Sequence, residues 1–347
     1  MKIGFKNLLL SASVLLCGCS SDAVNLGFKR DLTGFDNSLD GLKLNDPVSA
    51  FFNFCKEREN IRLLRENGDS FPWTDNPIFQ KGRFLNVFRE DDRVSKSILS
   101  FANELKDDLP KLIQAVFFAR WCNKQHTLDE LSSNILLEPE KLLKKIKSLN
   151  NWCNYNAYPV ESVFWNGKKY SRLNTAVELF FKIKESLEEM IIDANGDVIK
   201  ATIKINQEFK MKNDFPIFMA VIDLAWFRPD IIHPNSHVPT GIGAVAYLDR
   251  LQIYLGLKNH QETCEKMIEL QKEYWPEAKR KFQPIDIEYL SCECRKYYSY
   301  VNCTNYLKEK MFSSLYRKII ISIIIIILFL IWAEVGVGIF GTRFAGD

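Results

Sequence analysis

Apolar residues recur at helical spacing through residues 47–150, and this pattern most constrains how the chain can fold. Asp46 followed by Pro47 is typical of a helix start, with the aspartate as cap and the proline in the first turn. An apolar stripe at i, i+3, i+4 and i+7 follows, formed by Val48, Phe51, Phe52 and Cys55. Gly68 then ends this helix. Because residues 47–150 show no alternating strand pattern, the sequence predicts a mainly α-helical bundle.

Later segments give further local predictions. Thr127, with Glu130 three residues on, has the form of a capping box at a helix start. Asn166-Gly167 is a typical hairpin turn inside an aromatic segment, residues 152–170. Thr240 to Ala244 is a glycine-containing turn that leads into a helix over Val245 to Leu255.

Charge and cysteine content limit the classes of function. The chain has 347 residues, enough for one large helical unit or two small ones, and a net charge of only +3. That charge does not indicate nucleic-acid binding, which needs only a local basic face. Four basic residues lie mostly on the other face of the first helix: Lys56, Arg58, Arg62 and Arg65. They could contact phosphate, but a solvated face is the commoner arrangement. The 9 cysteines form no CxxC pair, so they are typical of a reducing compartment and buried positions.

The sequence predicts no metal site and no cofactor. His233 and His237 are four residues apart, but Pro234 and Pro239 exclude a regular helix that would present them together. The cysteines near the end of the helical region have no suitable fourth ligand: Cys292, Cys294 and Cys303.

The stretch from Phe71 to Val94, FPWTDNPIFQKGRFLNVFREDDRV, has an unusual density of aromatic and charged residues. Asp75 or Asn76 should cap a helix that has Pro77 in its first position. The expected apolar face of this helix is formed by Phe84, Leu85 and Phe88, and the flanking face by Arg83, Asn86 and Arg89. Both a solvated helix with surface ion pairs and a functional site fit this pattern.

This stretch resembles the signature of the helical domain of 5-hydroxymethyluracil DNA kinases. The same domain occurs in the predicted α-glutamyl/putrescinyl thymine pyrophosphorylases. Three later blocks follow in the family order: residues 152–170, residues 240–244 and residues 285–298. The resemblance therefore covers roughly residues 47 to 310. It implies a helix-hairpin-helix, DNA-glycosylase-like fold and an enzyme, a transferase, of DNA base hypermodification. Residues 46–310 would form this domain.

Two of the later segments carry candidate site residues. Asp223 lies in the apolar run FPIFMAVIDLAWF, where an acid must find a partner or have a raised pKa. Gly241 and Gly243 form the turn of the presumed hairpin, where a Cβ would block positive φ or the approach of a DNA phosphate. Both are therefore expected to bind DNA. The family usually has Gly-Pro-Gly-Ala there, whereas this chain has Gly-Ile-Gly-Ala.

The last block, IDIEYLSCECRKYY, is expected to pack against the central stretch. The resemblance implies that its acids Glu288 and Glu293 lie near Arg89 and answer its charge. An anionic substrate would keep one or two arginines of the site unpaired when the site is empty.

The resemblance also implies a reaction, in which an amine replaces a pyrophosphoryl group on the 5-methyl carbon of a thymine in DNA. The partners would be the modified DNA, an amine donor (an amino acid or a polyamine) and a DNA kinase acting upstream. The chain itself has no P-loop and is not that kinase. The expected proton acceptors are Asp92, Glu288, Glu293 and Asp223. The expected anion- and substrate-binding residues are Arg83, Arg89, Lys296 and Trp73.

The two ends of the chain predict different locations. Residues 1–21 resemble a lipoprotein signal with Cys19 as the lipidated residue, or a short uncleaved helix. Residues 22–45 have the composition of a linker. Residues 319–340 predict a transmembrane helix, and the basic residues before it place the helical domain on the cytoplasmic face. An exported lipoprotein is the alternative location.

Two other functions fit the sequence besides an enzyme. One is a non-catalytic DNA-binding protein held at the membrane, and the other is a lipoprotein with an inactive domain. The enzyme is favoured if Arg83, Asp92, Glu288 and Glu293 gather in one cleft. The other functions are favoured if these residues are scattered over the surface.

Overall fold

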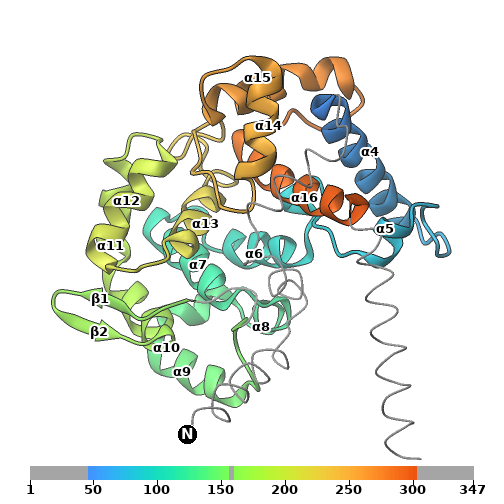
Figure 1. Ribbon diagram of the computed structural model, residues 1–347. Coiled ribbons are helices and arrows are strands. Elements are labelled where there is room, and N and C mark those ends of the chain that lie inside the picture. The colour runs from blue at the N-terminus through green and yellow to red at the C-terminus, as the bar shows by residue number, and fades with distance from the viewer. Residues whose placement is uncertain (1–45, 156–159, 303–347) are drawn as a thin grey trace, which may run out of the picture.

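The computed structural model describes residues 46–155 and 160–302, and these residues are mainly α-helical, as the sequence predicts (Figure 1). The α-helices are α4 (Pro47–Glu66), α5 (Pro77–Lys81), α6 (Arg93–Asn103), α7 (Leu109–Cys122), α8 (Gln125–Asp129), α9 (Pro139–Ser148), α10 (Arg172–Asn174), α11 (Phe180–Ile192), α12 (Val198–Phe209), α13 (Phe215–Leu224), α14 (Val245–Leu255), α15 (His260–Tyr274) and α16 (Pro284–Asn302). The elements η1 (Arg89–Asp91) and η2 (Ser133–Leu137) are 3-10 helices, and η3 (Thr175–Leu179) is a π-helix. The strands β1 (Val163–Trp165) and β2 (Lys168–Tyr170) form one antiparallel hairpin.

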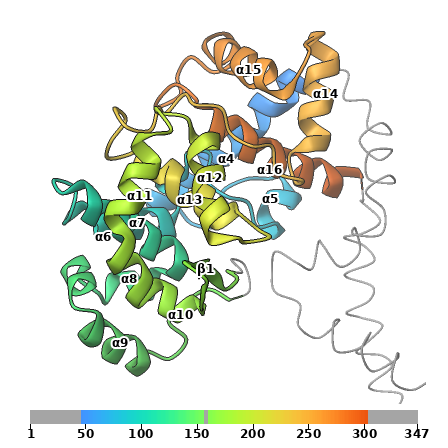
Figure 2. The ribbon, with the colours of Figure 1, turned by 90° about the vertical axis from the view of Figure 1, so that its left-hand side faces the viewer.

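The helices pack around two hydrophobic cores, which define two lobes. The middle lobe comprises α6 to α13, and its centre is α7, whose residues 112–122 are all buried. The terminal lobe comprises α4, α5 and α14 to α16, so that the first and last described helices share one core. Figures 1 and 2 show α4 beside α14, α15 and α16 at one end of the molecule, and α9 and the hairpin at the other.

The predicted start of α4 and the predicted hairpin are confirmed. Asp46 caps α4, its side chain accepting a hydrogen bond from the Ser49 N–H at 2.9 Å, and Pro47 occupies the first turn. Gly68 follows the end of the helix with φ +84°. Asn166 and Gly167 both have positive φ, which matches the right-handed twist of the strands that they join.

The central stretch is not the long helix that the apolar spacing predicts. Asn76 caps α5 as expected, but the helix ends at Lys81, and residues 82–88 are not helical. The backbone of these residues instead bonds to α16, where the Glu293 carboxylate accepts from the Leu85 N–H and the Tyr289 hydroxyl donates to the Asn86 carbonyl. The prediction failed because tertiary partners replace the hydrogen bonds within a helix.

Two further predictions are wrong. The capping box at Thr127 does not form, because α8 begins at Gln125 and Thr127 lies buried within it. The basic face of α4 is not simply solvated, since the side chains of Arg58 and Arg62 are both buried. Long arginine side chains reach partners that spacing along one helix cannot reveal.

The predictions for the two ends fall outside the described residues. The possible signal (residues 1–21), the linker (residues 22–45) and the span at residues 319–340 are among these. Of residues 46–155 and 160–302, no helix is long and apolar enough to cross a membrane.

Candidate functional site at the junction of the two lobes

The central stretch and α16 pack together, as the sequence predicts. Besides the bonds of Leu85 and Asn86 to α16, the Lys296 ammonium donates to the Arg83 carbonyl. Asn76, the cap of α5, donates to the Tyr297 hydroxyl at 2.7 Å. Residues more than 200 positions apart therefore form one wall of the terminal lobe.

Arg89 connects the terminal lobe to the middle lobe. Its Nη2 donates to Asp223 Oδ1 on α13 at 2.7 Å, and its guanidinium lies 4.9 Å from the centre of the Trp226 ring. Asp223 is fully buried, and Arg120 of α7 donates to both of its carboxylate oxygens. Asp223 is thus the direct partner of Arg89, while Glu288 lies close enough for the charge of Arg89 to act on it. The contacts of Asp223 are those of a clamp between lobes.

Glu288, on α16, also lies at the junction of the two lobes. Its Oε1 accepts a hydrogen bond from the Gly241 N–H at 2.8 Å. Burial raises the pKa of Glu288 to about 7, although the Gly241 hydrogen bond and the charge of Arg89 both act to lower it. A carboxyl group with this pKa exchanges a proton near neutral pH, as a general base requires.

Glu288 lines a cleft of about 570 Å³ between the lobes, which we call the Glu288 cleft. Ile199 and Val238 line it from the side of the middle lobe. The terminal lobe contributes a hydrogen-bonded relay, in which His260 Nε2 lies 2.7 Å from Asp249 Oδ1 and His260 Nδ1 lies 3.2 Å from Thr240 Oγ1. With Nε2–H bonded to the carboxylate, Nδ1 accepts from the threonine hydroxyl.

The sequence reasoning missed all three members of this relay. Thr240, Asp249 and His260 are 9 to 20 positions apart in the chain, with no spacing that marks them as a group. They meet because α14 and α15 pack side by side behind the 240–244 turn. The position of Thr240, directly before the turn, was the one available signal.

Asp92 and Glu293 are the other two acids expected at the site, and the charge of Arg89 acts on Asp92. Asp92 Oδ1 accepts from the Asn86 N–H at 3.1 Å. Burial raises the pKa of Asp92 to about 6, opposed by the Asn86 hydrogen bond and by the charges of Arg58 and Arg89. Glu293 accepts from the Leu85 N–H at 3.1 Å and from the Lys296 ammonium at 3.3 Å. Glu293 therefore holds the central stretch in place, while Asp92 is a second acid that can exchange a proton.

The predicted anion-binding residues do not gather at one place. Arg89 is buried against Asp223, and Lys296 is held by Glu293 and the Arg83 carbonyl. Arg83 and Trp73 instead line a separate, second cleft. Nor do Arg83, Asp92, Glu288 and Glu293 gather in one cleft, the arrangement that would favour an enzyme. Glu288 lines the cleft between the lobes and Arg83 lines the second cleft, and neither lining includes Asp92 or Glu293.

The two turn glycines are needed for close packing rather than for positive φ. Neither Gly241 nor Gly243 has positive φ, so that reason for glycine is wrong. A Cβ on Gly243 would lie 2.5 Å from Cys292 Sγ, and a Cβ on Gly241 would lie 3.0 Å from Glu288 Oε1. Glycine here lets the turn before α14 approach α16 closely. Binding of DNA phosphate by this turn stays a prediction.

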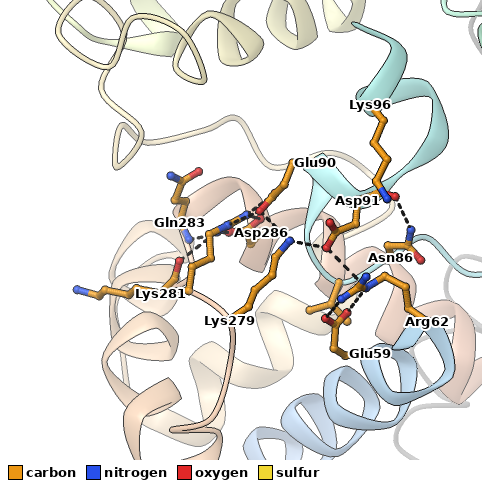
Figure 3. Close-up of polar contacts among 12 residues, drawn as sticks. Glu59, Arg62, Asn86, Glu90, Asp91, Lys96, Lys279, Lys281, Gln283 and Asp286 are labelled. Atoms are coloured by element: carbon orange, nitrogen blue, oxygen red, sulfur yellow. Dashed lines mark hydrogen bonds and ion pairs between the residues drawn. The ribbon is translucent and has the colours of Figure 1, made fainter. Parts of the chain in front are cut away.

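Glu90 and Asp91, which precede Asp92, belong to an extended ion-pair network (Figure 3). Arg280 donates to both oxygens of Glu90, at 2.8 and 2.9 Å, and to both oxygens of Asp286, at 2.6 and 3.0 Å. Lys279 pairs with Glu90 and Asp91 at 3.2 and 2.5 Å. These contacts fix η1 to the segment before α16 and thereby position Arg89 and Asp92.

Among residues 46–155 and 160–302, no cluster of His, Cys, Asp and Glu is arranged to hold a metal ion.

Comparison with known families matches residues 46–304 to a family described as "5-hmdU DNA kinase, helical domain". The match covers about three quarters of the 347 residues and includes both lobes. Searches of curated proteins and of solved structures each found no match. The lobes, their junction and the four sequence blocks all lie within the matched residues. The chain therefore belongs to the 5-hmdU DNA kinase helical domain family.

Proposed function

We propose that this protein modifies a base in DNA, replacing a pyrophosphoryl group on the 5-methylene carbon of uracil with an amine. Membership in the family implies DNA base hypermodification with modified DNA as the substrate. The observation that carries the proposal is Glu288, a carboxyl group with a pKa of about 7 on the wall of a cleft between two lobes. Junctions between lobes are common places for ligand sites, and groups with displaced pKa values cluster at such sites.

The proposed reaction is a substitution at the methylene carbon. A carbon–nitrogen bond forms, the carbon–oxygen bond to pyrophosphate breaks, and pyrophosphate leaves with the electron pair. The proton that the attacking amine loses passes to the Glu288 carboxylate. A DNA kinase acting upstream would supply the leaving group, since this chain has no phosphate-binding P-loop.

The Glu288 cleft has a suitable size and lining for an extruded base. Its volume of about 570 Å³ lies within the usual range of roughly 300–1,000 Å³ for ligand pockets. The relay of Thr240, His260 and Asp249 provides polar groups that can read the edge of the base. Lys258, exposed at the cleft, provides a positive charge for the leaving pyrophosphate. The 240–244 turn beside Glu288 is the presumed hairpin of a glycosylase-like fold.

The test supplies purified protein with an oligonucleotide that carries 5-(pyrophosphoryloxymethyl)uracil, together with an amine such as putrescine or glutamate. Mass spectrometry of the digested nucleosides is expected to show a 5-aminomethyl derivative that contains the amine. Glu288→Gln should lower its rate of formation about 100-fold or more, the usual contribution of a positioned general base. Glu273→Gln, at an exposed position on α15, is the matched control and should be unchanged.

The proposal fails if wild-type protein leaves the nucleoside unchanged with every amine tested, or if both variants are equally active. DNA binding without any product would instead favour a non-catalytic DNA-binding protein.

We also propose that residues 319–340 anchor the protein with its helical domain on the cytoplasmic face. Protease added to intact cells is expected to leave residues 47–310 uncut. Cleavage from outside would favour the exported lipoprotein.

A further inference from the structure

A second cleft, of about 530 Å³, opens between α4, residues 71–84 and the start of α6. We call it the arginine cleft, because four arginines line it: Arg58, Arg65, Arg83 and Arg93. Four aromatic residues also line it: Phe71, Trp73, Phe79 and Phe84. No aspartate or glutamate is among the described residues that line it. Four guanidinium groups around one cavity repel one another, so the arrangement favours an anionic ligand.

The positive charges of this cleft are largely unanswered by the protein. In residues 46–155 and 160–302, the side chains of Arg65, Arg83 and Arg93 form no hydrogen bond or ion pair. Surface arginines without partners are common, and these three alone would carry little weight.

Arg58, at the floor of the cleft, is the more informative residue. It is only 7% exposed, yet its Nη1 has no hydrogen-bond partner among the described residues. Its Nη2 donates to Asn86 Oδ1 at 2.5 Å and to the Phe84 carbonyl at 3.3 Å, and both bonds fix the guanidinium in place. Asp92, Glu293 and Glu59 act on Arg58 through their charges, but none of them forms a hydrogen bond or an ion pair with it. A buried, oriented donor without a partner is costly unless a ligand completes it.

The aromatic residues of the cleft specify the second part of the ligand. Phe71 is 60% exposed and packs edge to face on Trp73, with 5.4 Å between ring centres. The Trp73 indole is oriented by a hydrogen bond of 2.7 Å to the Asp69 carbonyl. Proteins that bind single-stranded nucleic acid combine cations that hold phosphate with exposed rings on which bases stack.

We propose that the arginine cleft binds a nucleotide unit, with its phosphate held by the arginines and its base stacked on Phe71 and Trp73. The unit is either part of a DNA strand that also reaches the Glu288 cleft or a free nucleotide. Forked guanidinium groups bind phosphate oxygens in pairs, which an ammonium group cannot do. The inference concerns binding alone and does not depend on the amine chemistry proposed above.

The experiment measures binding of the full chain to three probes at several salt concentrations. The probes are a fluorescent oligothymidylate, thymidine monophosphate and inorganic pyrophosphate, none of which carries the modified base. Absence of binding to the arginine cleft would therefore not bear on the reaction proposed for the Glu288 cleft. The variant is Arg83→Ala with Arg93→Ala, both at exposed positions. The matched control is Lys144→Ala with Lys147→Ala, which removes two exposed charges from α9 in the other lobe.

The arginine double variant should bind oligothymidylate about tenfold or more weakly, with a salt dependence smaller by roughly one to two counterions. Phe71→Ala should weaken oligothymidylate binding about fivefold or more, through lost stacking, and leave pyrophosphate binding unchanged. The control should stay within about twofold of wild type.

Two different results would support the proposal, and each would also identify the source of the nucleotide. Loss of oligothymidylate binding alone assigns the cleft to a DNA strand. Parallel loss of thymidine monophosphate binding assigns it to a free nucleotide. Equal losses in the arginine and lysine variants, or unchanged binding in both, would overturn the proposal.

Discussion

Helix α4 contributes arginines to two regions that treat positive charge in opposite ways. Arg62 belongs to the ion-pair network, where it pairs with Glu59 and Glu66 at 2.5 Å and lies 3.6 Å from Asp91. Arg58 and Arg65 face the arginine cleft, where no acid is among the described lining residues. Both regions include residues of the central stretch, Asp91 in the network and Arg83 in the cleft.

The difference distinguishes structural charges from binding charges. In the network, each cation is surrounded by carboxylates, and the pairs fix η1 to α4 and to the segment before α16 (Figure 3). In the arginine cleft, no carboxylate of the described residues lines the cavity beside the arginines. An anionic ligand would therefore supply the charge compensation that the lining of the cleft lacks. Removing a network residue should therefore affect stability, whereas removing a cleft residue should affect binding.

The largest expected effect is that of Arg280→Ala. It would leave Asp286, which is fully buried, without the guanidinium that bonds to both of its oxygens. Breaking a buried pair in this way costs about 3–5 kcal/mol. Urea denaturation followed by circular dichroism measures the loss, with the exposed Lys281→Ala as control. A loss no larger than that of the control would contradict a structural role for the network.

The second-largest effect is expected on acidification, which should weaken the ion-pair network. The charge and hydrogen bonds of Arg280 lower the pKa of Glu90 to about 2 despite burial, which acts to raise it. Its folded pKa lies below the ordinary 4.5, so its stabilisation is present above about pH 4.5 and is lost as pH falls toward 2. After screening by solvent at this partly exposed carboxylate, the window corresponds to roughly 2 kcal/mol. Glu90→Gln should be less stable at neutral pH and should lose less stability on acidification. Parallel stability curves would contradict this contribution.

Glu288 should show the opposite pH dependence. Its folded pKa, about 7, lies above the ordinary 4.5, so the folded state holds its proton more tightly than the unfolded state. Stability should then fall as pH rises from about 4.5 to 7, by roughly 2 kcal/mol after screening by water in the cleft. In Glu288→Gln this decline should be absent. Denaturation midpoints at a series of pH values provide the comparison, and an equal decline in both proteins would exclude Glu288 as its source.

The smallest effect on stability is expected for Arg83→Ala with Arg93→Ala. Both side chains are exposed and unpaired in the described structure, so the change should stay within about 0.5 kcal/mol. The same urea titration used for Arg280→Ala measures it. A loss of several kcal/mol would mean that the cleft arginines are structural, and the contrast between the two regions would disappear.

Local signals made the start of α4, the start of α5 and the hairpin predictable. Asp46 and Asn76 cap helices through their own side chains, and Asn166 with Gly167 adopts the positive φ that a tight hairpin turn requires. The path of residues 82–88 was not predictable, because α16, about 200 positions away, supplies the partners of that backbone.

The site was predictable only where the family resemblance indicated its position. The resemblance correctly brought the last block against the central stretch, where Glu293 accepts from the Leu85 N–H. The contact of Glu288 with the Gly241 turn was not predicted. The clamp between Arg89 and Asp223 was missed as a pair, because the apolar run around the aspartate shows that a partner is needed but not which one. The His260 relay was missed because its members come from two helices and a loop.

The central claim is that Glu288 accepts the proton in base modification. The most direct test is how the loss of rate in Glu288→Gln depends on pH. Single-turnover rates of wild-type protein and Glu288→Gln are measured on the pyrophosphorylated oligonucleotide from about pH 5 to 9. Their ratio cancels the titration of the amine and of Asp92, which both proteins share. The ratio should rise nearly tenfold per pH unit at low pH and level off above about 7, as Glu288 becomes fully ionised. A ratio that is the same at every pH would contradict the claim.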